Sequence, residues 1–391
     1  MTADTSRTVA PSRASLATDL RTLPPDLRAK LDAAGFEDQR LIALAATLTG
    51  DTATRRDTRN RVSGTVQVPD ASEIVDVPAP GTPETERLRT LGLSAIASGE
   101  LAFVVMAGGM ATRMGGVVKA LVEATPGKSF LELRLAENAA LGKQAGCPVP
   151  LWLMTSDATD APTREALARA GAPAHVKTFL QGLSLRLTEE GALFRSRDGE
   201  PSAYATGHGD LVDAVRRSGL LDAFRRDGGK VVWITNLDNL GATVDPAILG
   251  AFLSSSADVM VEVCDKVPGD KGGIPVHAGG RLQVLEEFRL PRGFDASAVT
   301  VFNTNTFLVR ADLLAATHIE WNWFEVEKKV DGVPIVQFER LLQELTGALS
   351  ATYLRVPRTG TGARFLPVKD HEELKKRRPE IEAALHARGI L

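Results

Sequence analysis

Residues 101–116 read LAFVVMAGGMATRMGG, a run of six apolar residues that passes directly into a glycine-rich segment. An apolar run without polar alternation is typical of a strand that is buried on both faces of a parallel sheet. Glycines directly after such a strand favour a tight turn, from which the chain returns through a helix. The stretch therefore predicts an α/β fold.

The same order of apolar run and amphipathic segment continues towards the C-terminus. It predicts strands at 150–155, 175–179 and 230–235, and helices at 130–143, 160–170, 209–226 (one or two) and 245–255. This alternation indicates a doubly wound, largely parallel sheet. Closely spaced apolar runs predict a mixed or antiparallel portion at 257–263, 281–288 and 299–309, and a charged helix follows at 370–388.

Towards the N-terminus the pattern is weaker. Residues 1 to about 25 are small and polar, which predicts a loose segment. Two short helices are expected between Pro24 and Leu48, and the proline-rich segment 77–80 is typical of a linker. We therefore expect a small, partly flexible helical N-terminal extension over residues 1–80 and one main domain over residues 81–391.

Composition argues against several functional classes. The 391 residues are 43% hydrophobic and 24% charged, with a formal net charge of -3, which gives no reason to expect nucleic acid as a partner. The N-terminus lacks an apolar signal segment and no stretch approaches the length of a membrane span, so no membrane partner is expected.

Two widely separated cysteines, Cys147 and Cys264, predict unpaired thiols in a reducing compartment. We expect a cytoplasmic protein.

The glycine-rich segment after the first strand offers a phosphate site. Gly108 and Gly109 let backbone N–H groups approach phosphate oxygens at the carboxyl end of a parallel strand. Arg113 and Lys119 add positive charge close by, which favours phosphate binding over an ordinary glycine-rich connection.

Two better-known phosphate motifs are ruled out by single residues. A dinucleotide fingerprint fails because Ala111 breaks the required glycine spacing. A P-loop fails because Val122 stands where the first glycine of GxxxxGK[ST] belongs, although Gly127-Lys128-Ser129 supplies its end.

Two further segments place polar side chains beside predicted strand or helix ends. His208 stands between two glycines in ATGHGD (205–210), which leaves room for a ligand to reach the backbone. Asp238 lies in TNLDNL (235–240), at the end of the strand 230–235, where open α/β sheets bind ligands. Mg²⁺ prefers one or two carboxylates together with phosphate oxygens, so Asp238 is a candidate ligand of Mg²⁺ or another divalent cation. An ordinary Asn/Asp-rich turn is the alternative.

In order along the chain, these segments resemble the UDP-glucose pyrophosphorylase family. The resemblance spans residues 90–370 and is strongest in GHGDLVDAVRRSGLLDAF (207–224), NLDNLGATVD (236–245), FNTN (302–305), IVQFE (335–339) and RFLPVK (364–369). The loop AGGMATRMG (107–115) and the segment MTSDATDAPTR (154–164) also resemble the UDP-N-acetylhexosamine pyrophosphorylases.

The resemblance implies a Rossmann-like nucleotidyltransferase core, a mixed and mostly parallel sheet flanked by helices, that joins UTP to glucose 1-phosphate. The implied catalytic residues are Lys119, Arg113, Asp238 and Lys369, with Asp238 also holding the metal. The implied substrate-binding residues are Ala107, Gly108, Gly109, Met154, Gln181, Gly207, His208, Asn236, Glu262, Gly273 and Asn303. Of these, Gln181 and Gly207 would read the uracil edge, and the last five would line the sugar-phosphate site.

The residue types suit this reaction. The attacking oxygen of a sugar 1-phosphate is already anionic at neutral pH, so no general base or protein nucleophile is needed. The barrier is repulsion between two polyanions, which a metal and lysines offset by positioning and electrostatic stabilisation. Two alternatives stay open: a uridylyltransferase for another sugar 1-phosphate (N-acetylglucosamine or galactose), and a non-catalytic nucleotide-sugar-binding protein on the same fold.

The chain departs from the family at two points. UDP-glucose members usually carry NGGLGT where this chain has AGGMAT (107–112), so Ala111 adds a methyl group beside the expected phosphates. Many eukaryotic members continue into a β-helical C-terminal domain used for assembly, for which no room remains after Lys369. We therefore expect a monomer.

Overall fold

The computed structural model describes residues 13–111, 114–270 and 272–391. Contacts divide the chain into two compact units of three segments each. The small unit comprises the chain up to Arg61, Gly182–Gly207 and Asn322–Arg340, and the large unit comprises Val62–Gln181, His208–Trp321 and Leu341–Leu391. This division differs from the expected boundary at residue 80, because the N-terminal helices share a core with two later segments of the chain.

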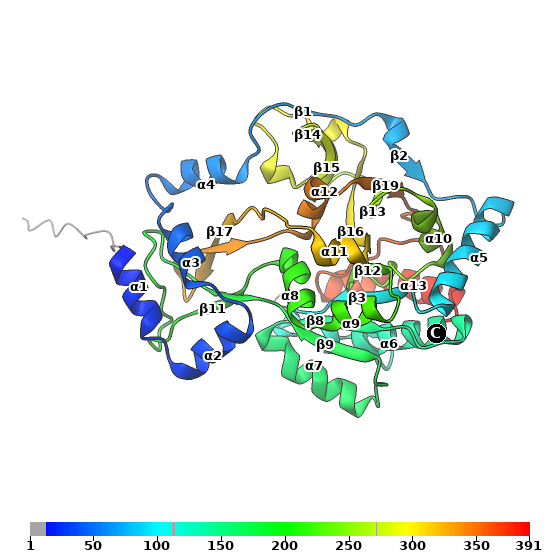
Figure 1. Cartoon of the computed structure of the whole chain (residues 1–391), viewed down its shortest axis with the longest axis horizontal. Helices are drawn as coiled ribbons and strands as arrows, with labels where there is room; N and C mark the ends of the chain where they lie inside the picture. Colours follow the sequence, from blue (N-terminus) through cyan, green and yellow to red (C-terminus); the bar gives the residue numbers. More distant parts are fainter. Residues whose placement is uncertain (1–12, 112–113, 271) are drawn as a thin grey trace, which may run out of the picture. The chain divides into compact units, whose positions relative to one another are not determined.

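The large unit is built on an eight-stranded sheet with the order β2-β19-β13-β16-β12-β3-β8-β9 (Figure 1). The strands are β2 (Ile74–Asp76), β3 (Leu101–Met106), β8 (Leu151–Thr155), β9 (Val176–Leu180), β12 (Val231–Asn236), β13 (Val259–Asp265), β16 (Val301–Arg310) and β19 (Ala351–Arg355). Neighbouring strands are parallel except at β16, which runs antiparallel to both β12 and β13. The expected α/β fold with a mixed, mostly parallel sheet is confirmed.

Helices of the large unit follow most of its strands. They are α5 (Pro83–Ala97), α6 (Phe130–Ala145), α7 (Asp157–Arg169), α8 (Leu211–Arg217), α9 (Leu220–Arg226), α10 (Pro246–Ser254), α11 (Ala311–Ala316), α12 (Leu345–Ala348) and α13 (His371–Ala387). Local sequence sets their starts: Ser129 and Glu132 form a reciprocal capping box at α6, and Thr82 caps α5 ahead of a proline. Each such cap stabilises a helix by about 1 kcal/mol.

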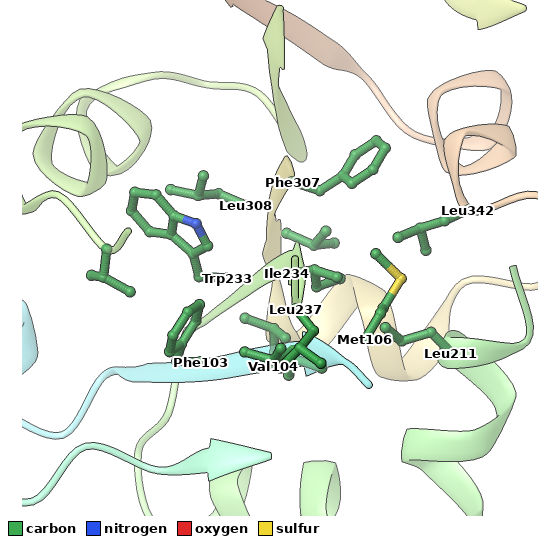
Figure 2. Close-up of a cluster of buried hydrophobic side chains, with 14 of the residues drawn as sticks. Phe103, Val104, Met106, Leu211, Trp233, Ile234, Leu237, Phe307, Leu308 and Leu342 are labelled. Atoms are coloured by element: carbon green, nitrogen blue, oxygen red, sulfur yellow. The ribbon is translucent and has the colours of Figure 1, made fainter. Parts of the chain in front are cut away.

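The core of the large unit lies along the central strands. Every residue of β3 is buried, as the uninterrupted apolar run predicts, and Phe103 of β3 pairs with Trp233 of β12. Figure 2 shows these two residues with Val104, Ile234 and Leu237 in one cluster. Burying one such side chain contributes roughly 1.5–3 kcal/mol, so the central strands form a rigid support for the loops at their ends.

Smaller elements surround this sheet. The strands β1 (Val66–Gln67), β14 (Ile274–Ala278) and β15 (Arg281–Leu285) form a separate antiparallel sheet, and the hairpins β4–β5 (Met110–Ala111, Val117–Val118) and β6–β7 (Glu123–Thr125, Lys128–Ser129) follow the glycine-rich segment. The strand expected over 281–288 therefore ends at Leu285, and a 3-10 turn, η5 (Glu287–Arg289), follows it.

The described part of the small unit contains four helices and two two-stranded antiparallel sheets. These are α1 (Arg13–Arg21), α2 (Pro25–Ala33), α3 (Asp38–Ala45), α4 (Thr52–Asn60), β10–β11 (Leu183–Leu185, Ala203–Ala205) and β17–β18 (Phe324–Val330, Val333–Glu339). The prediction that the chain is loose up to about residue 25 is wrong for residues 13–21, because Leu16 and Leu20 of α1 are buried in the unit's core.

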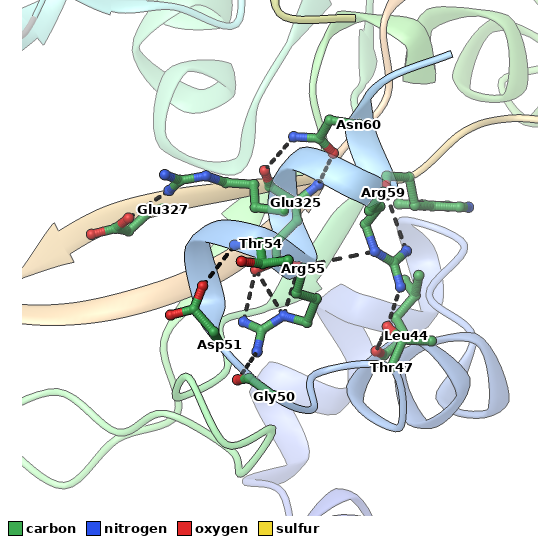
Figure 3. A network of polar contacts seen from close by, with 12 residues as sticks. Leu44, Thr47, Gly50, Asp51, Thr54, Arg55, Arg59, Asn60, Glu325 and Glu327 are labelled. Carbon is green, nitrogen blue, oxygen red and sulfur yellow. Dashed lines mark hydrogen bonds and ion pairs between the residues drawn. The ribbon is translucent and has the colours of Figure 1, made fainter. Parts of the chain in front are cut away.

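Ion pairs join α4 to β17 within the small unit (Figure 3). The guanidinium of Arg55 donates to both oxygens of Glu325, and the side chain of Asn60 exchanges two hydrogen bonds with the backbone of Glu325. The Glu325 carboxylate is 1% exposed, so the pair is fully desolvated and its partners hold one another in place.

Among the described residues, no helix is both long enough and apolar enough to span a bilayer.

Candidate active site

The carboxyl ends of four parallel strands form the edge where the predicted site residues lie. Asn236 pairs with Met106, Met106 with Met154, and Met154 with Phe179, so β12, β3, β8 and β9 end side by side. From β3 the chain first adds β8 and β9 on one side and later β12 on the other. The switch point therefore falls between β3 and β12, where open α/β sheets bind their ligands.

Gly108 and Gln181 meet at this edge. A Cβ atom on Gly108 would stand 2.9 Å from Oε1 of Gln181 and 3.4 Å from the backbone nitrogen of Ser156, so glycine is needed for this close approach. The Ser156 hydroxyl donates to the carbonyl of Gly108 (2.9 Å), and the Ala107 N–H donates to the carbonyl of Met154 (2.8 Å). Four residues of the predicted nucleotide side are therefore brought together.

Lys119 and Asp238 form an ion pair across the switch point. The Lys119 Nζ atom lies 2.5 Å from Oδ2 of Asp238, and each side chain is 18% exposed. Lys119 opens the turn η3 (Lys119–Leu121), and its backbone N–H donates to the carbonyl of Gly109 (3.3 Å). The pair thus joins the glycine-rich segment after β3 to the turn after β12, as expected of two residues acting on one substrate.

A bulge in β16 brings a second asparagine to Asn236. The register of β13 and β16 shifts between Glu262 and Val263, and Asn305, at this shift, has φ = 61°. Its Nδ2 donates to Oδ1 of Asn236 (3.0 Å), and its backbone N–H donates to Oδ1 of Asn303 (2.8 Å). Bulges and left-handed non-glycine residues concentrate at functional sites. The sequence segment FNTN marked this region, but the site role was assigned to Asn303 alone.

The ring of His208 is held by one backbone hydrogen bond. Its Nδ1 accepts from the N–H of Leu342 (3.0 Å), which joins the turns η4 (His208–Asp210) and η7 (Leu342–Glu344). A ring nitrogen that accepts carries no proton, so the neutral ring has its proton on Nε2. Burial lowers the pKa of His208 to about 4. At neutral pH this histidine is therefore an uncharged hydrogen-bond donor.

Glu262 lies in the core rather than at the open edge. Its side chain is 0% exposed, and both of its oxygens accept from the guanidinium of Arg364 (2.9 and 2.6 Å). Arg364 also donates to the carbonyl of Thr243 (2.7 Å). Its carboxylate is therefore buried and paired with Arg364, and the implied sugar-side role of Glu262 stays a prediction.

A carboxylate that sequence reasoning missed stands beside Gly273. A Cβ atom on Gly273 would lie 3.2 Å from Oε1 of Glu286, and the same oxygen accepts from Nε2 of Gln343 (2.5 Å). Burial raises the pKa of Glu286, with the neighbouring charge of Glu287 acting in the same direction. The Gly273 carbonyl in turn accepts from the Asn303 N–H (2.8 Å), so Gly273 and Asn303 lie together as predicted. No local sequence signal distinguishes Glu286 from a surface glutamate.

The contacts described above do not include three of the predicted residues. Lys369 lines a surface pocket of about 660 Å³ with Arg358 and Phe365 beside α13, and its backbone N–H donates to Glu373 (2.7 Å). Gly207 belongs to the small unit, where its φ of 87° places it against the backbone of Arg340. Arg113 lies outside the described residues.

The donor set at Asp238 suits a divalent cation that also binds substrate phosphates. Among the described residues, no group of three or more His, Cys, Asp and Glu side chains could hold an ion. A lone carboxylate beside a lysine therefore needs phosphate oxygens to complete a metal shell, which is the arrangement that Mg²⁺ favours. The residues fit the expected cation.

Comparisons with known proteins point to one family. A family model described as UTP--glucose-1-phosphate uridylyltransferase matches residues 56–378. The proteins of that name from Musa acuminata and Saccharomyces cerevisiae are 32% and 30% identical to the chain, over 70% of its length in each case. The chain covers 62% and 58% of those two proteins, which is less than two thirds of either.

Solved structures share the fold. The uridine diphosphate N-acetylglucosamine pyrophosphorylase from Trypanosoma brucei, in complex with inhibitor, aligns over 95% of this chain and 82% of its own, with a TM-score of 0.76 and 20% identity. A UDP-glucose pyrophosphorylase mutant from Leishmania major, in complex with UDP-glucose, aligns over 94% and 79%, with a TM-score of 0.65 and 21% identity. At these identities the likeness establishes the architecture of the sheet.

Proposed function

The chain belongs to the UTP--glucose-1-phosphate uridylyltransferase family, and on that premise we propose that it forms UDP-glucose and pyrophosphate from UTP and glucose 1-phosphate. The observation that supports this most directly is the Lys119–Asp238 pair beside Gly108 and Gln181, at the switch point of the sheet. At this edge of the sheet, the phosphates of a nucleotide and of a second substrate could both lie close to the ammonium of Lys119.

The reaction is an in-line displacement at the α-phosphorus of UTP. A phosphate oxygen of glucose 1-phosphate forms a new bond to that phosphorus, the bond from it to the α,β-bridging oxygen breaks, and pyrophosphate leaves with the electron pair. No proton is removed from the attacking group. A divalent cation bound through Asp238 would supply charge neutralisation between the phosphates.

The chain's own residues would place the two substrates. Gln181 and the backbone around Gly108 would bind the uracil, and the glycine-rich segment with Lys119 would bind the phosphates of UTP. With a cation held by the carboxylate of Asp238, the ammonium of Lys119 would be free to pair with a phosphate oxygen. Approach of the acceptor phosphate is then favoured by both charges.

The acceptor would bind on the other side of the switch point. Asn236, Asn303 and Asn305 supply amide groups there, and His208 supplies a neutral N–H from Nε2. Glu286 supplies a carboxylate beside Gly273 that can accept from a sugar hydroxyl. Lys369, which lines the pocket beside α13, would contribute a further positive charge for a substrate phosphate.

A pyrophosphate-release assay tests the proposal. The enzyme is mixed with UTP and a panel of sugar 1-phosphates (glucose, galactose, N-acetylglucosamine), with Mg²⁺ or with a chelator. We expect Mg²⁺-dependent release with glucose 1-phosphate that an Asp238→Asn variant lowers at least 100-fold. Release with N-acetylglucosamine 1-phosphate alone would reassign the acceptor, and release with none would leave a nucleotide-sugar-binding protein.

A further inference from the structure

A buried arginine on α6 lies beneath the turn that carries Asp238, which we name the Asp238 turn (residues 236–244). The Arg134 side chain is 0% exposed. Its Nη2 donates to the carbonyls of Asn236 (2.9 Å) and Asn239 (2.7 Å), the residues on either side of Leu237 and Asp238. Its Nη1 donates to the carbonyl of Ala242 (3.3 Å). One guanidinium therefore binds three carbonyls, that of the last residue of β12 and two in the irregular segment that follows it.

The partner of Arg134 extends this anchor to the end of the turn. One oxygen of Glu137 accepts from Nη1 of Arg134 (2.6 Å), and the other accepts from the backbone N–H of Val244 (3.0 Å). Both charges are buried, and a buried charge without a partner costs several kcal/mol. Both Nη atoms of Arg134 and both oxygens of Glu137 are thus paired with one another or with the backbone of the Asp238 turn, while the buried Nε of Arg134 has no hydrogen-bond partner among the described residues. These contacts hold α6 and the turn together.

The anchor also sets the direction of Asp238. The carbonyls of Asn236 and Asn239, on either side of Asp238, accept from Arg134 in the interior. Without that partner, each would be a buried unpaired carbonyl, which costs free energy. The side chain of Asn239 is likewise engaged inside, donating to the carbonyl of Arg364 (3.1 Å) and accepting from the N–H of Leu366 (2.8 Å). The carboxylate of Asp238 is left on the outer side, against Lys119.

We propose that Arg134, paired with Glu137, is a positioning residue that preorganises Asp238 to receive a divalent cation. It contacts neither substrates nor cation, and acts through the carbonyls that flank Asp238. The inference rests on the proposed function for its catalytic consequence, although the anchoring itself is independent of activity. Substituting residues that orient a metal ligand typically lowers metal affinity or activity 10- to 100-fold.

The test compares two lysine variants of the full chain. Arg134→Lys keeps the charge beside Glu137, but a lysine cannot donate in a plane to three carbonyls. Arg216→Lys is the matched control, because Arg216 of α8 also donates to two backbone carbonyls, those of Leu314 (2.8 Å) and Thr317 (2.7 Å), outside the Asp238 turn. Amide hydrogen exchange of residues 236–244, Mn²⁺ binding with UTP by electron paramagnetic resonance, and kcat and KM are measured for each.

For Arg134→Lys we expect faster exchange in the Asp238 turn, Mn²⁺ affinity and kcat lowered 10- to 100-fold, and a KM for the sugar 1-phosphate within a factor of about two. Arg216→Lys should leave all four unchanged. Unaltered exchange in Arg134→Lys, or faster exchange with unchanged kcat and Mn²⁺ affinity, would overturn the proposal. If Arg134→Lys does not fold, Glu137→Gln, which keeps the shape of the pair, is measured in the same way. A wild-type enzyme without turnover would instead remove the proposed function, while exchange would still report whether Arg134 holds the turn.

Discussion

The ammonium of Lys119 and the carboxylate of Asp238 lie 2.5 Å apart, one from the segment after β3 and the other from the turn after β12. The two residues are separated by 119 positions in sequence and meet only because β3 and β12 are neighbouring parallel strands. Their pairing places one positive and one negative charge at the switch point, where the order in which strands are added to the sheet reverses.

Replacing Lys119 by alanine should lower kcat at least 100-fold, because the charge that offsets the UTP phosphates is lost. The fold should persist, since a partly exposed ion pair contributes only about 0–1 kcal/mol. Steady-state pyrophosphate release and thermal unfolding check the two statements. Turnover close to that of the wild type would remove the assigned role of Lys119.

Gly108→Ala should weaken UTP binding, with a KM raised about tenfold. The added Cβ would stand 2.9 Å from Oε1 of Gln181, so the amide that is assigned to the uracil must move. Gly362→Ala is the control, because a Cβ there meets nothing within 4 Å and the residue has no assigned part in substrate binding. Equal KM values for the two variants would show that the Gly108–Gln181 contact does not matter for binding.

Folding stability should depend on His208 in mildly acidic solution. The pKa of this histidine is about 4 in the folded protein and about 6.5 in an unfolded chain, so the unfolded state takes up the proton first as pH falls. The stabilising contribution is complete above pH 6.5, declines below it, and is lost as pH falls through 4.

Urea unfolding of the wild type and of His208→Asn between pH 4 and 8 tests this window. The difference in unfolding free energy between the two proteins should be constant above about pH 6.5 and change below it. A difference that does not vary with pH would mean that the ring of His208 is not buried in solution.

The buried pair of Glu262 and Arg364 should behave as a structural unit. Arg364→Met leaves the Glu262 carboxylate without its partner, which should destabilise the protein by about 3–5 kcal/mol. The double variant with Glu262→Gln should recover part of that loss, because no charge is then left buried. Denaturant unfolding measures both. Additive effects of the two substitutions would contradict the coupling that the 2.6 Å contact indicates.

The sheet could be predicted from sequence because its signals are local. Apolar runs mark the strands, and the glycine-rich segment and TNLDNL follow two strands whose neighbourhood places them at one edge. Contacts between distant segments could not be predicted in the same way. Nothing in the strand of Glu262, for example, shows that Arg364, 102 positions later, binds its carboxylate.

Two other residues show the same limit. A charged side chain within a helix, such as Arg134, ordinarily indicates a solvent-exposed face, and its buried position depends on a turn more than 100 residues away. The left-handed backbone of Asn305 arises from a register shift between two strands, which no spacing of residue types encodes. α1 was missed because its two buried leucines stand in an otherwise polar stretch.

The reversed direction of β16 has a consequence for how such a sheet could diversify. Because β16 is antiparallel to β12, its first half lies beside the end of β12, and there Asn305 donates to Asn236. The connection that enters β16 can therefore change in length or composition while β3, β8 and β9 keep their loops. On the proposed function, the groups that select the acceptor and those that select the base would lie on opposite sides of β3 and β12, so either set could change during evolution without rebuilding the other.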